Sequence, residues 1–240
     1  MRLHFSGSSK ALLTVGVLLV FAALTPAVAG TLIVGLPADV GGNAFPFGGD
    51  YAHNTNGQYQ QVYTHGLFSG PITITGLEFY NTQVNGRATA MNTGTFTISL
   101  STTAADWNTL SATAASNIGS DETQVFIGSL AQPWAFGDTL SIAFSTPFTY
   151  TPGVNANLLL NVVATGTGDA AGDIAFDTNG CCISDTIFGR NWGGNFNYGY
   201  GLVTGFDTGT STSATPEPAT FAFLSAGLAG LSLLRKRVRR

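Results

Sequence analysis

Residues 158–163 read Leu158-Leu159-Leu160-Asn161-Val162-Val163 and are mostly apolar at both odd and even positions. Successive side chains of a β-strand point to opposite faces, so this pattern predicts a central strand that is buried on both sides. Residues 96–100 and 140–145 instead alternate apolar with polar side chains, which is typical of half-buried strands. The chain therefore combines interior and one-sided strands, as a layered β-protein does.

Turn dipeptides divide the rest of this region into short segments. They are Asn85-Gly86, Gly137-Asp138, Pro152-Gly153 and Asn179-Gly180. Between them, strands are expected at residues 58–63, 123–130, 147–151, 174–177 and 201–206. We predict an all-β fold in which residues 30–214 form one two-sheet β-sandwich or jelly-roll-like body, with its core at about 58–206.

Two local features refine this prediction. Ile74 and Leu77 lie on opposite parities of one apolar segment, which predicts a β-bulge at Gly76 between them. Residues 103–115 are rich in Ala, and we expect either a short helix or a loop that crosses one end of the sheets.

The charges are divided unevenly along the chain. Only 9% of the 240 residues are charged, and most of the basic ones lie at the two ends. Residues 30–214 contain 2 basic and 12 acidic residues, a net charge of −10. Such a body repels phosphate backbones, so we expect no nucleic-acid partner.

The N-terminal residues 1–29 have the three parts of a signal peptide. Arg2 and Lys10 precede an apolar run at 11–23, and the small residues Ala27 and Ala29 are suited to signal peptidase, with cleavage before Gly30. The alternative is an uncleaved anchor, for which the apolar run is short.

The C-terminal residues 215–240 have a different order of parts. A motif at 215–219 precedes an uncharged helix at 220–234, and a basic end at 235–240 is expected to stay cytoplasmic. Because the signal peptide directs the body across the inner membrane, the C-terminal transmembrane helix predicts transient insertion there. A simple tail anchor is the alternative.

This tail resembles a PEP-CTERM sorting signal through Pro216, Glu217 and Pro218, the Gly- and Ala-containing apolar helix, and the basic end. The resemblance implies processing by exosortase, a membrane transpeptidase, and final delivery to the cell surface or the extracellular matrix. The body also resembles domains that often precede such tails, through residues 59–63, 71–77, 100–103 and 157–162. That second resemblance bears on fold and context alone.

No catalytic constellation is recognisable in the body. It has two histidines, His53 and His65, and no Gly-x-Ser-x-Gly motif surrounds a serine. Glu78, Asp106, Asp121 and Glu122 supply carboxyl groups, which sequence alone does not pair as a glycosidase requires. We expect no enzyme activity and no cofactor; a secreted hydrolase is an alternative.

Three further groups of residues are candidates for binding or cross-linking: three aspartates, two adjacent cysteines and an aromatic segment. Asp169, Asp173 and Asp177 recur every four residues and are candidate ligands for Ca²⁺, although in a strand they would lie about 13 Å apart; the alternative is a solvated acidic edge. The adjacent Cys181 and Cys182 are candidates for a vicinal disulfide, with reduced thiols or a link to another chain as alternatives.

Residues 190–200 are rich in aromatic residues, Asn and Gly. Trp192, Tyr198 and Tyr200 are candidates for stacking on sugar rings. The alternative is that Trp192 and Phe196 cap the open end of the sandwich. Taken together, the chain is expected to be an exported structural or adhesive protein associated with exopolysaccharide, with a carbohydrate-binding module at residues 190–200 as the alternative.

Overall fold

The computed structural model describes residues 30–36, 42–48, 57–84, 89–91, 93–166, 174–179 and 186–209. The predicted signal peptide and sorting tail lie outside these residues. The described part of the chain is all-β and contains no α-helix, as the sequence predicts. None of its helical segments has the length and apolar character needed to cross a bilayer.

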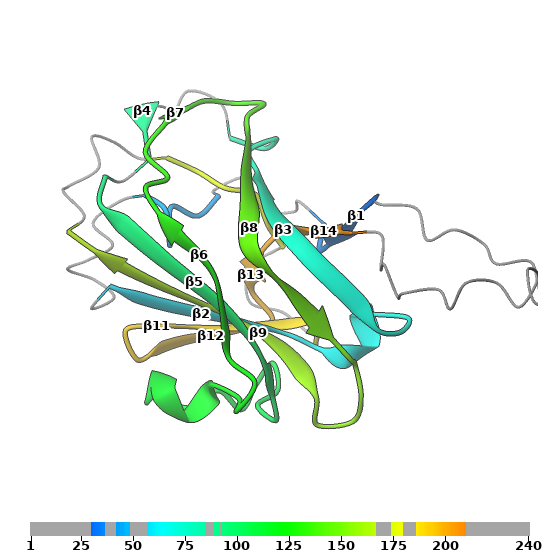
Figure 1. Cartoon of the computed structure of the whole chain (residues 1–240). Helices are drawn as coiled ribbons and strands as arrows, with labels where there is room; N and C mark the ends of the chain where they lie inside the picture. Colours follow the sequence, from blue (N-terminus) through cyan, green and yellow to red (C-terminus); the bar gives the residue numbers. More distant parts are fainter. Residues whose placement is uncertain are drawn as a thin grey trace, which may run out of the picture.

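Two antiparallel sheets make up the body (Figure 1). The six-stranded sheet has the order β12 (Asn195–Tyr198), β11 (Phe188–Trp192), β2 (Gln58–Tyr63), β9 (Asn157–Thr165), β5 (Thr95–Thr103) and β6 (Thr123–Gly128). The four-stranded sheet has the order β1 (Gly30–Val34), β14 (Thr204–Thr208), β3 (Ile72–Tyr80) and β8 (Thr139–Tyr150). The remaining elements are the strand pairs β4 (Thr89–Ala90) with β7 (Pro133–Trp134) and β10 (Thr178–Asn179) with β13 (Gly201–Leu202), and the 3-10 turns η1 (His65–Leu67) and η2 (Ala114–Asn117).

Strand β9 lies inside the six-stranded sheet and is buried on both faces, which confirms the interpretation of residues 158–163. Leu158 and Leu160 belong to the main core between the two sheets. Leu159 points to the opposite face and packs with Val62 and Leu110 in a second, smaller cluster. The six-stranded sheet therefore has apolar residues on its outer face as well, meaning the face turned away from the four-stranded sheet.

The covering loop, residues 104–122 between β5 and β6, shields that outer face. Figure 1 shows it against the side of the six-stranded sheet that is remote from β3 and β8. It contains turns and η2 and no α-helix. Of the two forms expected for residues 103–115, the loop is the one observed, and it lies across a sheet face instead of across one end.

The bulge expected at Gly76 is present. The register of β3 against β8 shifts between Ile74 and Gly76, and both Ile74 and Leu77 are buried despite their opposite parities. On β8, Ala143 pairs with Gly76 and Phe148 pairs with Ile74, so residues 144–147 bulge out of the ladder. The two strands predicted at 140–145 and 147–151 are consequently one strand, and Pro147 is tolerated because β8 is an edge strand.

The strand predicted at residues 174–177 is largely absent. Only Phe176 forms a bridge there, with Asn43, and the neighbouring strand β10 begins at Thr178. The reason is that side chains and loops satisfy this backbone: Trp134 Nε1 donates to the carbonyl of Ala175 at 2.8 Å. The prediction of a full strand was wrong at this place.

Two core tyrosines carry their hydroxyl groups into the interior. Tyr59 and Tyr63 are fully buried; Tyr59 donates to Gln61 Oε1 at 2.6 Å, and the Tyr63 hydroxyl lies 2.8 Å from Thr204 Oγ1. Burial disfavours the phenolate and raises the pKa of both residues well above the ordinary value of 10.0.

Alkaline pH is therefore expected to unfold the protein. Above about pH 10 the unfolded chain releases the Tyr63 proton and the folded chain retains it, so the free energy of unfolding falls by about 1.4 kcal/mol per pH unit for this group. Denaturant titrations between pH 8 and pH 12 measure this slope. In Tyr63→Phe the decrease in the free energy of unfolding with pH is expected to lose the contribution of one proton, about 1.4 kcal/mol per pH unit. An unchanged slope would contradict the raised pKa of Tyr63.

Candidate functional site: an amide-lined pocket on the outer sheet face

A row of polar side chains crosses the outer face of the six-stranded sheet. Directly opposed residues of antiparallel strands point to the same side, and the register aligns Asn191 on β11, Gln60 on β2, Asn161 on β9 and Ser99 on β5. All four are buried. Polar groups in such positions need hydrogen-bond partners, and the covering loop supplies part of them.

The hydrogen bonds of this row form a connected network. Gln60 Nε2 donates to the carbonyl of Ala114 at 3.0 Å and to Asn161 Oδ1 at 3.2 Å, and Gln60 Oε1 accepts from Asn117 Nδ2 at 2.8 Å. Asn161 Nδ2 continues the network to Ser99 Oγ at 3.3 Å. Ser99 Oγ then donates to Glu122 Oε1 at 2.6 Å, so the network joins the middle and the last residue of the covering loop to the sheet.

Close packing at Gly189 adds to this attachment. A side-chain carbon at Gly189 would overlap the backbone carbonyl of Trp107, because the covering loop lies directly on β11 there. Leu110 of the same loop packs against Val62 and Leu159. The covering loop is thus held by apolar contacts near its start and by amides further along.

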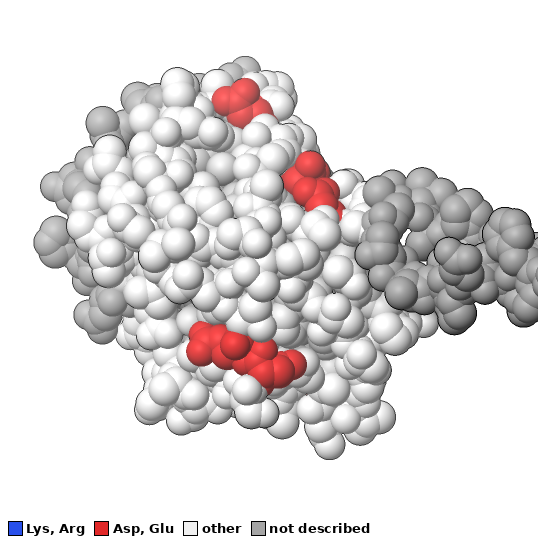
Figure 2. All heavy atoms as spheres, in the orientation of Figure 1, with Lys and Arg blue, Asp and Glu red and all other residues white. Residues whose placement is uncertain are grey.

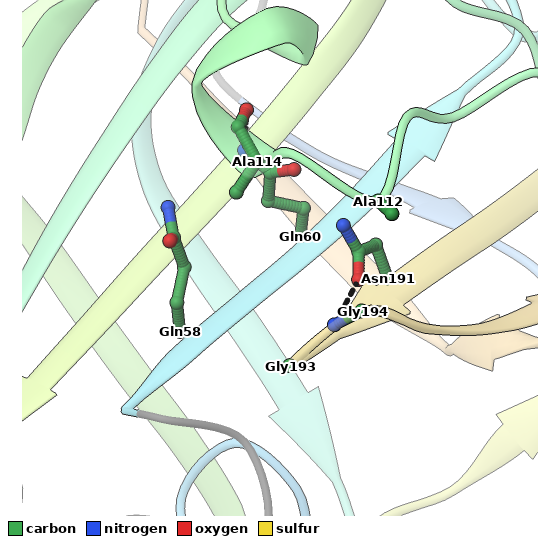
Figure 3. A pocket seen from close by; sticks show the side chains of 7 residues that line it. All are labelled: Gln58, Gln60, Ala112, Ala114, Asn191, Gly193 and Gly194. Atoms are coloured by element: carbon green, nitrogen blue, oxygen red, sulfur yellow. Dashed lines mark hydrogen bonds between the residues drawn. The ribbon is translucent and has the colours of Figure 1, made fainter.

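A pocket of about 170 Å³ opens between the covering loop and the turn of the β11–β12 hairpin (Figure 3). The residues that line it come from three distant parts of the chain: Gln58, Gln60, Ala112, Ala114, Asn191, Gly193 and Gly194. Asn191 joins two of its walls, since Asn191 Nδ2 donates to the carbonyl of Ser111 at 2.9 Å and Asn191 Oδ1 accepts from the amide of Gly194 at 3.0 Å.

The turn itself requires glycine. Gly193 and Gly194 have φ values of 60° and 86°, the backbone conformation of a two-residue type I′ hairpin turn. Their lack of side chains also keeps this wall of the pocket open. The lining as a whole carries no charged residue, so it offers amide and backbone hydrogen bonds together with two methyl groups.

The predicted aromatic candidates lie on different faces of the hairpin. Tyr198 is 45% exposed on the outer face, where its ring packs edge-on to Trp107 at a centroid distance of 6.4 Å and stacks with Phe196 at 6.2 Å. Trp192 points to the inner side, stacks on Phe45 at 5.3 Å and packs against the core. Tyr200 is buried. The three candidates therefore share no common surface, and of them Tyr198 alone is exposed.

Arg190 packs against the buried ring of Tyr200. Its guanidinium group lies 4.2 Å from the Tyr200 ring centroid, and Arg190 Nε donates to Asn197 Oδ1 at 3.0 Å. The side chain is 6% exposed, and Arg190 Nη1 has no hydrogen-bond partner in the described part of the chain. Arg190 is the one Lys or Arg of the described residues, so the face in Figure 2 shows scattered acidic groups and no basic ones.

The candidate carboxylates are held by structural hydrogen bonds. Glu78 accepts from the Tyr80 hydroxyl at 2.8 Å, and Asp121 accepts from the amide of Thr102 at 2.7 Å. Asp106 accepts from the amide of Trp107 at 2.8 Å. Glu122 belongs to the amide network. These contacts tie each carboxylate to its local backbone or to a neighbouring side chain.

The candidate Ca²⁺ residues are only partly described. Asp177 is buried, and its oxygens accept hydrogen bonds from the Thr82 amide, the Thr82 hydroxyl and the Gln83 amide at 2.6–3.1 Å. Asp169 and Asp173 lie outside the described residues, as do Cys181 and Cys182. Among the residues that the structure describes, no group of three His, Cys, Asp or Glu could hold a metal ion.

The pocket residues were not anticipated from the sequence. A usable signal was present: amides occupy regular strand positions at Gln58, Gln60 and Asn161, and Asn161 interrupts an otherwise apolar strand. Comparisons with models of protein families, with curated proteins and with solved structures find no match to this chain.

The packing at Gly189 yields a stability test. Gly189→Ala forces the covering loop away from β11 and is expected to lower the free energy of unfolding by about 1–3 kcal/mol, the usual cost of overpacking. The matched control is Gly66→Ala, where an added carbon meets nothing within 4 Å. Thermal or chemical denaturation compares the two, and equal stability of both variants would show that the covering loop is not held as described.

Proposed function

We propose that this chain is an exported, non-catalytic protein that adheres to neutral polysaccharide at the cell surface or in the extracellular matrix. The observation that carries the proposal is the uncharged, amide-lined pocket, with the exposed ring of Tyr198 on the same sheet face. Amides donate to and accept from hydroxyl groups, and aromatic rings stack on the C–H faces of sugars. The acidic body gives no attraction for anionic polymers.

The export route forms the second part of the proposal. Signal peptidase removes residues 1–29, the apolar helix at 220–234 inserts transiently in the inner membrane, and exosortase processes the chain near Pro216-Glu217-Pro218. Cleavage before Gly30 would leave the whole of β1 (Gly30–Val34) in the mature body. Gly30 pairs with Thr208, and Thr208 Oγ1 donates to the carbonyl of Gly30 at 2.8 Å.

This pairing places both ends of the body at one edge. Figure 1 shows the ends of β1 and β14 on the right and the β11–β12 turn on the left. The pocket also belongs to the outer face of the other sheet. A body attached through its C-terminal segment therefore keeps the pocket face free.

Filling the pocket is expected to abolish adhesion. Ala112 lines the pocket and is exposed, so Ala112→Phe places a ring in the cavity with little effect on folding. The full chain, purified in mild detergent, is tested for co-sedimentation with insoluble β-glucan, mannan and chitin, with alginate as the anionic comparison. We expect binding to at least one neutral polymer and at least a tenfold loss in Ala112→Phe.

The control for this experiment is Ala115→Phe, at an exposed residue of the same loop that does not line the pocket. It is expected to bind as the parent chain does. Tyr198→Ala is expected to weaken binding as well, whereas Phe136→Ala, at a 51% exposed ring elsewhere, is not. Binding to alginate alone, or equal binding of both Phe variants, would refute the adhesive function.

The sorting route has a separate test. Replacing Pro216, Glu217 and Pro218 together by Ala is expected to leave an uncut precursor in the inner-membrane fraction of the native cell, because exosortase no longer recognises the tail. Mass spectrometry of the fractions locates the C-terminus, and Ser213→Ala serves as the control. Normal surface delivery of the triple variant would disprove sorting by this motif.

A further inference from the structure

The pocket combines an apolar surface with an amide surface, and a simple hydroxyl group would use only the amide surface. The covering loop contributes the methyl groups of Ala112 and Ala114, and the two strands contribute the amides of Gln58, Gln60 and Asn191. Figure 3 shows Gln58 on one side of the pocket and Asn191 with Ala112 on the other. A ligand that fits both surfaces has an apolar end and a planar group with one donor and one acceptor.

The hydrogen-bonding capacity left in the lining matches such a group. Gln58 Nε2 uses one hydrogen on Asn161 Oδ1 at 3.0 Å, and its Oε1 takes part in no protein hydrogen bond among the described residues. Asn191 Nδ2 uses one hydrogen on Ser111, and its second hydrogen has no partner among the described residues. Gln60, by contrast, donates both amide hydrogens to acceptors within the protein, so it lines the pocket without a donor for a ligand.

We propose that the pocket binds the acetamido group of an N-acetylated hexosamine within a neutral polysaccharide, an inference that rests on the proposed adhesive function. The acetamido N–H donates to Gln58 Oε1, its carbonyl accepts from Asn191 Nδ2, and its methyl group lies against Ala112 and Ala114. The space is sufficient: a pocket of about 170 Å³ exceeds several-fold the 10–15 Å³ that one water needs. The four heavy atoms of the group therefore fit, with room for part of the sugar ring.

The same lining disfavours the two charged relatives of this sugar. A free amino sugar brings an ammonium group, and no carboxylate lines the pocket. A uronic acid brings a carboxylate, and Arg190 lies on the opposite face of β11 from Asn191, since neighbouring residues of a strand point to opposite sides. The pocket is thus selective for the uncharged, acetylated form.

The test compares three tetrasaccharides of equal length and linkage that differ only in the substituent at the second carbon of each sugar. Chitotetraose carries acetamido groups, its fully deacetylated form carries ammonium groups, and cellotetraose carries hydroxyl groups. Isothermal titration calorimetry with the full chain in mild detergent measures the three affinities. We expect chitotetraose to bind at least tenfold more tightly than either of the others.

Variants assign that preference to the pocket. Gln58→Leu removes the acceptor for the acetamido N–H and is expected to reduce the preference five- to tenfold; Asn161 Oδ1 retains its bond from Gln60, so the fold is preserved. The matched control is Gln124→Leu, at an exposed amide on the edge strand β6, which leaves the preference unchanged.

The outcomes separate the acetamido assignment from the adhesive function on which it rests. Equal affinity for chitotetraose and cellotetraose, or a preference that survives Gln58→Leu, overturns the acetamido assignment and leaves adhesion to neutral polysaccharide in place. Binding of other neutral polymers without any of the three tetrasaccharides does the same. If no neutral polysaccharide of any kind binds, the adhesive function itself fails.

Discussion

The covering loop stays on the six-stranded sheet because a set of buried amides joins the two. Gln60 and Asn117 are almost completely inaccessible to water, and the hydrogen bonds that Gln60 makes to Asn117 and to Ala114 form only when the loop is docked. An unpaired buried amide costs about 1–3 kcal/mol, so a partly docked loop is unfavourable at several groups at once. The apolar contacts of Leu110 with Val62 and Leu159 would be lost in the same event. Docking is therefore cooperative, and the pocket at its margin has a fixed shape.

The sequence predicted the parts of the fold that depend on local periodicity. Residues 158–163 lie inside a sheet because no other environment suits apolar residues of both parities, and the parity change at Gly76 is a bulge for the same local reason. Pro147 misled the interpretation of β8, since whether a strand lies at an edge is a property of the whole sheet. Residues 174–177 do not form the predicted strand, because their backbone bonds to distant groups such as the Trp134 ring.

The regular amide positions of the strands signal the polar row, but local periodicity does not predict the pocket, because its walls come from three segments far apart in the chain. The orientation of the aromatic residues, by contrast, follows from the sequence of the hairpin turn. Gly193-Gly194 is a two-residue hairpin signal, and that register pairs Trp192 with Asn195. Trp192 and Tyr198 must then point to opposite faces. The same register buries Arg190 against Tyr200 and directs Asn191 to the pocket, so one glycine turn determines both the closure of the core and the outer site.

The sheet order also suits a protein that is pulled through its C-terminal segment. Strand β14, which ends at Thr208, lies between β1 and β3 and is not an edge strand. A force applied beyond Thr208 meets two antiparallel ladders, and β14 leaves the sheet only when both are broken. A ligand bound in the pocket would be held by β2 and β11 of the opposite sheet and by the covering loop that lies on that sheet. The load between the two therefore crosses the apolar core, whose large buried aromatic residues resist separation of the sheets. A proposed adhesive role thus agrees with where the ends, the core and the pocket lie.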